Sequence, residues 1–310
     1  MVATGTITAR VRDCSRDGFI VVAVLWILAA LATLAAVASA YVAQSAVALT
    51  ANDDTTQSDL LVRAAIELVA YQVSSPVAER RPRHGTFELR LVRTDIGVDF
   101  MSEAARINLN TAPKAMIAGL FAALGAGTSA EQYADRVIGW RRSPKPDAQD
   151  DEDALYRAAG LAYFPRRGPF SHIDELWLVL GLPPALVERA LPFVTIYSGM
   201  RDINVLDAAP EVVAALPGMS PGRLNAFLNE RETLPPDPEF IAGALGAQEG
   251  ITTKASDAYR VRIRLGFPDG RRKTAEVVIA VNTGGDGPYG VLSWRDDIDR
   301  AASRMAEARR

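Results

Sequence analysis

The distribution of apolar and polar positions sets the N-terminal part of the chain apart from the rest. From Phe19 to Asn52 no side chain is charged over 34 consecutive positions. The run FIVVAVLWILAALATLAAV within it is long enough to cross a bilayer, because about 20 residues at 1.5 Å rise per residue span a hydrocarbon layer of about 30 Å. We therefore predict a transmembrane helix over residues 19–50.

The residues before this run indicate its orientation. Three arginines outnumber two aspartates in residues 10–17, and the positive-inside rule keeps such a short basic segment in the cytoplasm. The remainder of the chain is then expected on the other side of the membrane. A cleaved secretory signal is an alternative, because Ala38-Ser39-Ala40 has the small residues of a signal-peptidase site.

A helical pattern continues beyond the apolar run, within residues 58–73. One face is expected to pack on the globular part because its positions recur at i, i+3, i+4 and i+7. These positions are Leu61, Ala64, Ala65, Leu68 and Gln72. Asp59, Arg63 and Glu67 form an i, i+4 ladder of charges on another face. The polar triplet 52–54 predicts a local break where the helix leaves the bilayer.

Strands are predicted near both ends of the globular part. Phe87, Leu89 and Leu91 alternate with their neighbours, and a second run covers residues 96–101. Towards the C-terminus the apolar residues Tyr259, Val261, Ile263 and Leu265 alternate with the arginines Arg260, Arg262 and Arg264. This predicts a half-buried strand with a basic outer face, followed by a returning strand over 273–282. We interpret the arginines as a solvated face, with a docking stripe as the alternative.

Between these strands the chain contains a weak internal repeat. INLNTAP at 107–113 and INVLDAAP at 203–210 match at Ile-Asn and at Ala-Pro, and each is followed by a helical pattern. We expect two small helical units, each entered from an extended segment. Asn110 or Thr111 in the first copy, and Asp207 in the second, are expected to cap the helix just ahead of its proline.

Composition removes several classes of chemistry. The single cysteine, Cys14, excludes a disulfide framework, and two histidines, His84 and His172, exclude a multi-histidine metal centre. Ser171, His172 and Asp174 adjoin one another at a predicted helix start, so their side chains do not converge as a nucleophile, base and acid would. We interpret Ser171 as an N-cap and expect neither a catalytic centre nor an enzyme.

A nucleic-acid partner is a second alternative. The segment LPGMSPGR at 216–223 is similar to the hairpin of helix-hairpin-helix proteins, which cradles a DNA phosphate on backbone N–H groups. However, Pro221 removes one such donor. Residues 107–240 carry 12 Lys and Arg against 17 Asp and Glu, a net charge of −5, which repels a phosphate backbone. No nucleic acid is therefore expected as a partner.

The border between the charged leader and the apolar run resembles a type IV prepilin leader. Gly18 directly precedes Phe19 there, and a glycine lets the backbone extend into a protease site without a Cβ in the way. The resemblance implies that prepilin peptidase cuts after Gly18 and methylates the new N-terminus at Phe19. Major subunits of that family carry glutamate at mature position 5, where this chain has Ala23.

Absence of that glutamate, together with an ordered set of landmarks, makes the chain similar to the type II secretion minor pseudopilin K family (general secretion pathway protein K). The landmarks are INLNTAP, GPFSHIDELWLVLGLP at 168–183, LPFVTIYSG at 191–199, INVLDAAPEVVAALPGM and VLSW at 291–294. The resemblance implies a tip subunit, which initiates and caps the pseudopilus for export of folded proteins across the outer membrane. It implies minor pseudopilins I and J and the major pseudopilin G as partners.

The resemblance also implies an α+β fold: a long N-terminal transmembrane helix and a pseudopilin α/β head with a large inserted helical domain of the SAM-like or helix-hairpin-helix-like kind. The protein would cross the inner membrane once, with its N-terminus cytoplasmic and its head periplasmic. We expect a leader at 1–18, a transmembrane helix at 19–50, the first head elements at 51–106, the insertion with two SAM-like units at 107–250, the closing strands at 251–296 and a polar tail at 297–310.

An acidic stretch, PDAQDDED at 146–153, is the one candidate cation site. Calcium takes 6–8 oxygen ligands, which suits such a loop, and the family resemblance implies calcium in the helical domain near this position. The candidate ligands are Asp147, Asp150, Asp151 and Asp153. Their spacing is not that of an EF-hand, and a flexible acidic loop without metal is the favoured interpretation.

Overall fold

The computed structural model describes residues 15–75, 77, 80–143, 151–246, 249–282 and 287–296. The chain divides into two units, Met1–Leu60 and Leu61–Arg310. The long first helix, α1 (Ser15–Val73), contributes to both. In its described residues the first unit is helical throughout.

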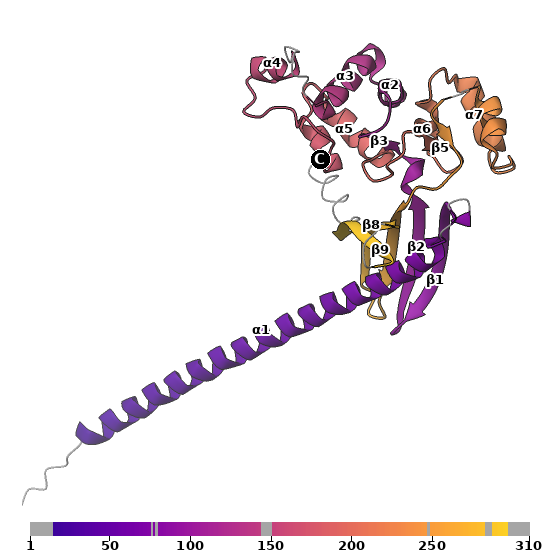
Figure 1. Cartoon of the computed structure of the whole chain (residues 1–310). Helices are drawn as coiled ribbons and strands as arrows, with labels where there is room; N and C mark the ends of the chain where they lie inside the picture. Colours follow the sequence, from indigo (N-terminus) through magenta and orange to yellow (C-terminus); the bar gives the residue numbers. More distant parts are fainter. Residues whose placement is uncertain are drawn as a thin grey trace, which may run out of the picture. The chain divides into compact units, whose positions relative to one another are not determined.

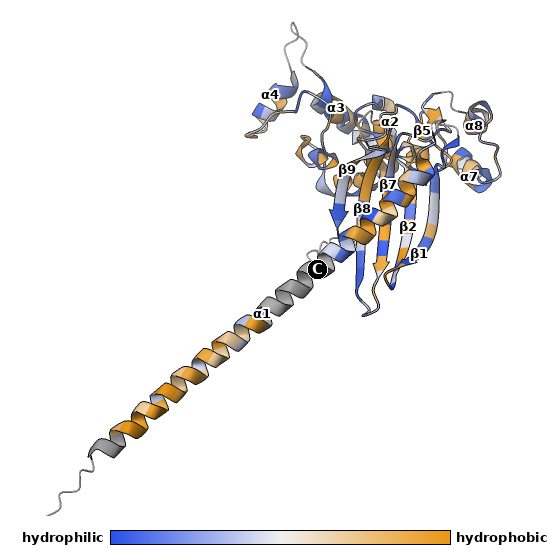
Figure 2. Cartoon of the chain, turned by 60° about the horizontal axis from the view of Figure 1, so that its bottom comes forward, coloured by the Kyte–Doolittle hydropathy of each residue, from blue (hydrophilic) through white to orange (hydrophobic). Residues whose placement is uncertain are grey.

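The first unit carries the apolar span. Between Phe19 and Val42 the helix has 24 residues with a mean hydropathy of 2.8, and none of its most apolar stretch is buried. Hydrophobic colour predominates along this part of α1 (Figure 2). The span therefore has the length and composition of a membrane-crossing helix.

The helix break predicted at residues 52–54 is wrong. Helix α1 runs through these positions without interruption. Asparagine and aspartate are only moderately less favourable than alanine inside a helix, by up to about 0.7 kcal/mol per residue. The surrounding alanines, leucines and glutamine favour the helix, so three polar residues do not end it.

The second unit contains a five-stranded antiparallel sheet (Figure 1). Its strands are β1 (His84–Leu91), β2 (Thr94–Ser102), β7 (Ala258–Gly266), β8 (Arg272–Val281) and β9 (Tyr289–Asp296). Their order across the sheet is β1-β2-β7-β8-β9. Strand β2 pairs with β7 along its length, with Val98 opposite Ile263. The last strands therefore return to pair with the first, as the family resemblance implies for a head interrupted by an insertion.

One face of the sheet packs against residues 61–73 of α1. The buried helix positions are Leu61, Val62, Ala65, Ile66, Val69, Ala70 and Val73. The predicted contact face is thus wrong in part, since Leu68 is 43% exposed and Gln72 is exposed as well. The observed face buries four β-branched side chains, which removes more apolar area from water than a face centred on Leu68 and Gln72.

Alternation along the strands decides which side chains meet α1. Val261 and Ile263 on β7, like Val98 and Phe100 on β2, belong to the buried cluster that includes the helix. The alternate positions of β7 carry the three arginines and face the other way. The strands predicted from period-two patterns are therefore confirmed, and so is the α+β class.

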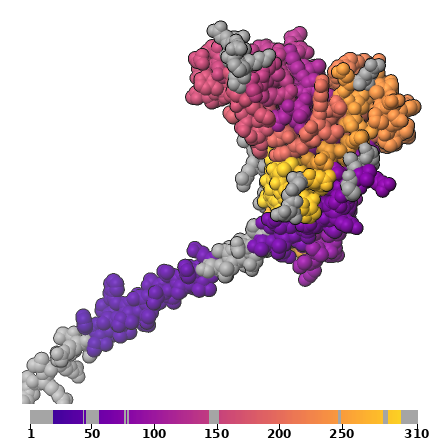
Figure 3. All heavy atoms as spheres, viewed as in Figure 1, coloured from indigo at the N-terminus to yellow at the C-terminus, as the bar shows by residue number. Residues whose placement is uncertain are grey.

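The helices other than α1 lie between β2 and β7 in the chain. They form two neighbouring lobes, which are magenta to pink and orange in Figure 3. The first comprises η2 (Glu103–Ala105), β3 (Ile107–Asn108), α2 (Lys114–Ala123), η3 (Gly127–Ser129), α3 (Ala130–Arg141), α4 (Asp151–Ala158), η4 (Ile173–Leu178), α5 (Pro184–Ala190), η5 (Leu191–Phe193) and β4 (Val194–Thr195). The second comprises β5 (Ile203–Asn204), α6 (Pro210–Ala214), α7 (Pro221–Glu230), α8 (Pro238–Leu245) and β6 (Ile251–Thr252).

The sequence repeat corresponds to a repeated geometry. In each lobe the Ile-Asn pair forms a short strand that pairs in parallel with the strand closing the same lobe, β3 with β4 and β5 with β6. Both asparagines, Asn108 and Asn204, are buried. The side-chain oxygen of each accepts a hydrogen bond from the backbone N–H two residues later, at 2.8 and 3.1 Å. The two lobes therefore begin with the same turn.

The predicted helix caps are wrong. Helix α2 has Pro113 as its N-cap and α6 has Ala209, and neither position makes a side-chain capping bond. Asn110 instead exchanges two hydrogen bonds with the backbone of Phe170. Thr111 donates to the carbonyl of Met200. The predicted capping side chains are thus recruited by segments distant in sequence, which local propensity does not register.

The two lobes pack closely at one glycine. A Cβ atom built on Gly119 of α2 would lie 2.3 Å from the backbone oxygen of Ala215, at the end of α6. A backbone atom cannot swing aside as the end of a flexible side chain can, so a larger residue there would force the lobes apart. Glycine at 119 therefore permits the contact between the two halves of the insertion.

Candidate functional site

The predicted processing residues lie on the described part of α1. Gly18, Phe19 and Ala23 are helical, and Phe19 is 76% exposed. Cleavage after Gly18 and the role of Ala23 remain predictions.

Only part of the candidate calcium set falls in the described residues. Asp147 and Asp150 lie outside them, and Asp151 is described only as the first residue of α4. The carboxylate of Asp153 is paired with Arg167, with Nη2 2.7 Å from Oδ1. Among the described residues no three His, Cys, Asp or Glu side chains are placed to hold one metal ion.

The interpretation of Ser171 as an N-cap is wrong by one position. Helix η4 begins after His172, whose Nδ1 accepts a hydrogen bond from the N–H of Asp174 at 3.2 Å. Ser171 uses its backbone N–H instead, which donates to Glu175 at 3.0 Å. An imidazole nitrogen can cap because its neutral form has one acceptor lone pair. These residues serve the local turn.

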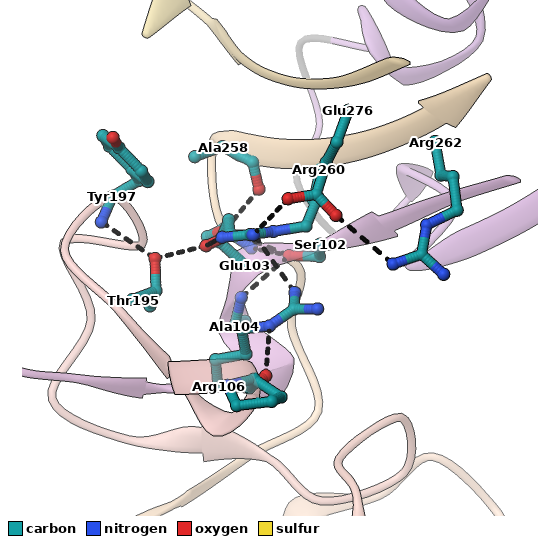
Figure 4. Close-up of polar contacts among 12 residues, drawn as sticks. Ser102, Glu103, Ala104, Arg106, Thr195, Tyr197, Ala258, Arg260, Arg262 and Glu276 are labelled. Atoms are coloured by element: carbon teal, nitrogen blue, oxygen red, sulfur yellow. Dashed lines mark hydrogen bonds and ion pairs between the residues drawn. The ribbon is translucent and has the colours of Figure 1, made fainter. Parts of the chain in front are cut away.

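A charged cluster, which sequence reasoning did not find, lies where the insertion meets the sheet (Figure 4). We call it the junction cluster, and it consists of Glu103, Arg106, Arg260, Arg262 and Glu276. Glu103 begins the turn after β2, and its side chain is fully buried. Arg260 reaches it from β7, with Nε 2.8 Å from Oε1 and Nη2 3.2 Å from Oε2. The pair is a two-pronged guanidinium–carboxylate contact, the strongest geometry for such ions.

The insertion completes the surroundings of Glu103. Thr195, on the closing strand of the first lobe, donates its hydroxyl to Oε2. Arg106 donates from Nη1 to Oε1 at 3.1 Å and from Nε to the carbonyl of Pro192 at 3.0 Å. Both oxygens of the carboxylate thus accept two hydrogen bonds each. A carboxylate with its lone pairs filled in this way is suited to hold elements together.

Electrostatics in the junction cluster favour its charged form. Burial by itself would raise the pKa of Glu103, but Arg260 and Arg106 and the hydroxyl of Thr195 outweigh it and hold that pKa below the usual value. Burial would likewise lower the pKa of Arg260, and the carboxylates of Glu103 and Glu276 raise it instead. The cluster is therefore a buried ion network whose members depend on one another.

The arginines of β7 do not form a uniform solvated face, and that interpretation is wrong for Arg260. Its side chain is 13% exposed and is enclosed by two glutamates. Arg262 and Arg264 are about half exposed, at 55% and 54%. Arg264 pairs with Asp99 on β2. The three positions thus pass from a buried ion network at the insertion to exposed pairs further along the strand.

A second polar joint ties the other lobe to the sheet. The buried carboxylate of Asp207 lies 2.7 Å from Nδ1 of His84 at the start of β1, and Nε of Arg83 lies 3.7 Å from its other oxygen. Asp207 follows the Ile-Asn strand of the second repeat by three residues. Each lobe is therefore anchored to the sheet by one buried carboxylate, Glu103 in the first and Asp207 in the second.

Weak signals for this junction exist in the sequence. Glu103 stands between Ser102 and two alanines at the end of a predicted strand, where a charge beside small residues suggests burial with a partner. The arginines at 260, 262 and 264 indicate which strand face is basic. The identity of the pair was not predictable, because 157 residues separate Glu103 from Arg260.

The second unit thus has the architecture of a pseudopilin head: a helix on one face of an antiparallel sheet, with a helical insertion between β2 and β7. Residues 85–199 match the family described as type II secretion system (T2SS), protein K. The resemblance predicted from the sequence is confirmed by this match.

A solved structure shares the fold. The chain is similar to a chain of the GspK-GspI-GspJ complex of the type 2 secretion system of enterotoxigenic Escherichia coli, with a TM-score of 0.57 and 16% identity. The similarity covers 79% of this chain and 98% of that chain. No curated protein matches the sequence.

Proposed function

We propose that the protein is a minor pseudopilin K, which occupies the tip of a type II secretion pseudopilus and there initiates and caps assembly for the export of folded proteins across the outer membrane. The observation that carries the proposal is the match of residues 85–199 to the protein K family. The fold agrees with it, because a large helical insertion separates strands β2 and β7 of the head along the chain. In this role the protein is a structural subunit and not an enzyme.

The N-terminal helix supports anchoring in the inner membrane. The span Phe19–Val42 is long and apolar enough to cross, and the basic excess before it favours a cytoplasmic N-terminus. The head would then lie in the periplasm. Prepilin peptidase would act at the border of this helix, after Gly18.

The position at the tip follows from two features. A positively charged N-terminus buried among apolar helices is costly unless a carboxylate offsets it, and Ala23 provides none at the position where major subunits carry glutamate. The insertion between residues 107 and 250 is also bulky for a head repeated along a packed shaft. Such a subunit can begin a filament but is a poor link within it.

The partners proposed are minor pseudopilins I and J, with the major pseudopilin G below them. The similar solved chain belongs to a complex whose name includes GspI and GspJ. We propose an equivalent three-subunit tip for this protein.

Immunogold labelling of sheared pseudopili tests the tip position. With the major pseudopilin overexpressed, antibody against residues 107–250 is expected to label one end of each filament. An antibody against the major subunit serves as the control and is expected to label the shaft. Label from the first antibody spaced along the shaft would contradict the proposal.

A DNA-uptake protein with helix-hairpin-helix units remains the second candidate. The turn between α6 and α7 has Gly218 in the left-handed region, at φ 73°, as the hairpin pattern requires. The net charge of −5 over residues 107–240 weighs against it. A titration with duplex DNA at low salt separates the two candidates.

We also propose calcium binding in the acidic stretch 146–153, with Asp147, Asp150, Asp151 and Asp153 as candidate ligands. A ligand that binds only the native state raises its stability by RT ln(1 + [L]/Kd). The full chain in detergent is therefore expected to melt at a higher temperature in calcium than in chelator. The difference is expected to vanish in the variant Asp147→Asn plus Asp150→Asn.

The choice of these two aspartates avoids a side effect. Asp153 pairs with Arg167, so its removal would lower the melting temperature even without calcium. A matched control is Glu131→Gln plus Asp135→Asn on α3, where both side chains are exposed and contact Lys114. A wild-type melting curve that is the same in calcium and in chelator would reject the site.

A further inference from the structure

A cavity of about 380 Å³ opens beside the junction cluster. It lies on the sheet face that carries Arg260 and Arg262, opposite the face covered by α1. Eight of the side chains that line it are polar or flexible: His84, Thr86, Asp99, Met101, Arg106, Arg260, Arg262 and Glu276. The cavity therefore places the least buried member of the cluster, Arg262, in reach of a molecule from outside.

The junction cluster contains one positive charge more than it contains negative charges. Arg106, Arg260 and Arg262 supply three guanidinium groups, whereas Glu103 and Glu276 supply two carboxylates. Neighbouring charges do not correct the difference, because Asp99 is paired with Arg264 and Asp207 with His84 and Arg83. A single extra carboxylate would balance the cluster.

The unused hydrogen-bond donors lie on the side of the cavity. Arg262 makes one side-chain hydrogen bond within the described part of the chain, a long one of 3.4 Å to Glu276. Glu276 already accepts a shorter bond of 2.8 Å from Arg260. A guanidinium has five N–H donors, so most of those on Arg262 are free. In Figure 4 one terminal nitrogen of Arg262 points to Glu276 and the other points away from it.

Arg106 offers a second donor. Its Nε and Nη1 are used by Pro192 and Glu103, and its Nη2 makes no hydrogen bond within the described residues. Burial lowers the pKa of Arg106, and the charge of Arg260 lowers it further. An additional carboxylate at the cavity would relieve that repulsion.

We propose that this cavity receives one carboxylate side chain, an aspartate or glutamate, from a partner subunit of the pseudopilus tip, bound by Arg262 and Arg106. The inference rests on the proposed function for the identity of the partner as another pseudopilin. It goes beyond that function because it assigns the docking position on this chain and the chemistry of the contacting group.

The charges of this face select a carboxylate over a phosphate. A phosphate group brings nearly two negative charges, one more than the cluster lacks, and would face the carboxylates of Glu276 and Asp99. A nucleic-acid backbone repeats its charge every few ångströms and meets the same two acidic groups. A protein surface can instead present a single carboxylate, whose one negative charge equals the excess positive charge of the cluster.

The test compares two neutralised arginines in the full chain, purified in detergent. Arg262→Gln removes the guanidinium that faces the cavity, and Arg189→Gln on α5 makes the same charge change at an exposed residue. Fluorescently labelled chain is titrated with the pair of minor pseudopilins I and J from the same secretion system. Because hydrogen bonds to charged groups are the strong ones, Arg262→Gln is expected to raise Kd at least about tenfold. Arg189→Gln is expected to leave it within about twofold.

Folding of the variant is measured alongside. Arg262→Gln leaves two guanidiniums against two carboxylates, so we expect its melting temperature to equal that of the wild type. If the wild-type chain binds the I and J pair and Arg262→Gln binds it with the same Kd, the inference about the cavity is overturned and the proposed partnership stands. No binding of the wild-type chain to the I and J pair overturns the proposed partnership and the inference with it. Duplex DNA bound at physiological salt by the wild type and not by Arg262→Gln would assign the cavity to nucleic acid instead.

Discussion

Replacement of Glu103 by glutamine is expected to lower the free energy of unfolding of the head by about 3–5 kcal/mol, the usual cost of leaving the other half of a buried ion pair uncompensated. Glutamine has nearly the same shape, so packing is retained. Arg260 and Arg106 would then stand buried beside an amide that presents its own N–H groups. The measurement is urea denaturation of the full chain in detergent, followed by tryptophan fluorescence.

Two variants separate this effect from a general loss of charge. Glu88→Gln on β1 removes an exposed carboxylate and is expected to change stability by less than about 0.5 kcal/mol. The double variant Glu103→Gln plus Arg260→Gln removes both partners, so it is expected to lose less than the sum of the single variants. Additive losses, or a Glu103→Gln variant as stable as Glu88→Gln, would contradict the assignment.

The same variant changes how stability depends on pH. The native carboxyl of Glu103 has its pKa below the usual value because of its arginines and Thr195, which outweigh burial. The unfolded chain therefore takes up this proton at a higher pH than the native protein does, and stability rises with pH across that interval. The contribution is complete above the ordinary glutamate pKa of about 4.3 and is lost as pH falls below it. In Glu103→Gln the free energy of unfolding is therefore expected to fall less steeply as the pH is lowered through this range.

Elements with a strong local pattern were predictable from the sequence. Strict alternation places Val261 and Ile263 on the inner face and the arginines on the outer face of β7, because successive strand residues point to opposite sides. The antiparallel return of the last strands was predictable only through the family resemblance. A period-two pattern indicates a strand but not its neighbour.

The helix face on residues 61–73 illustrates the limit of periodicity. Apolar residues occupy every position there except Arg63, Glu67 and Gln72, so two overlapping stripes satisfy a 3.6-residue period. In the structure the stripe that contains Val62, Ile66, Val69 and Val73 is buried against the sheet. The choice depends on the opposing sheet surface, which is absent from a local pattern.

The partners of the two buried carboxylates, Glu103 and Asp207, could not be predicted from the sequence for a related reason. Asp207 resembles a helix cap in sequence, yet its side chain bonds His84 across a separation of 123 residues. Glu103 contacts Thr195 across 92 residues and Arg260 across 157. Ion-pair partners are fixed by closure of the sheet around the insertion. Sequence can indicate that a buried charge needs a partner, but the fold decides which one.

Complete loss of N-terminal processing is expected for Gly18→Val. Extended backbone at the position before a cut must fit the peptidase without a side chain, and glycine meets that need at no steric cost. A β-branched valine restricts the backbone and adds two methyl groups at the same point. The variant is therefore expected to retain residues 1–18 and to migrate as the larger precursor on a gel. Mass spectrometry of the intact wild-type chain is expected to show an N-methylated Phe19 as the first residue.

The control and the two contrary outcomes are distinct. Gly5→Val makes the same substitution inside the leader, away from the border between charged and apolar residues, and is expected to mature normally. A Gly18→Val chain that still begins at Phe19 would remove the support for a prepilin leader, and with it the inference that Ala23 stands at mature position 5. A wild-type chain that begins at Tyr41 would instead assign cleavage to the site at Ala38-Ser39-Ala40. That cut would release the head from the membrane, because it removes nearly all of the apolar span Phe19–Val42.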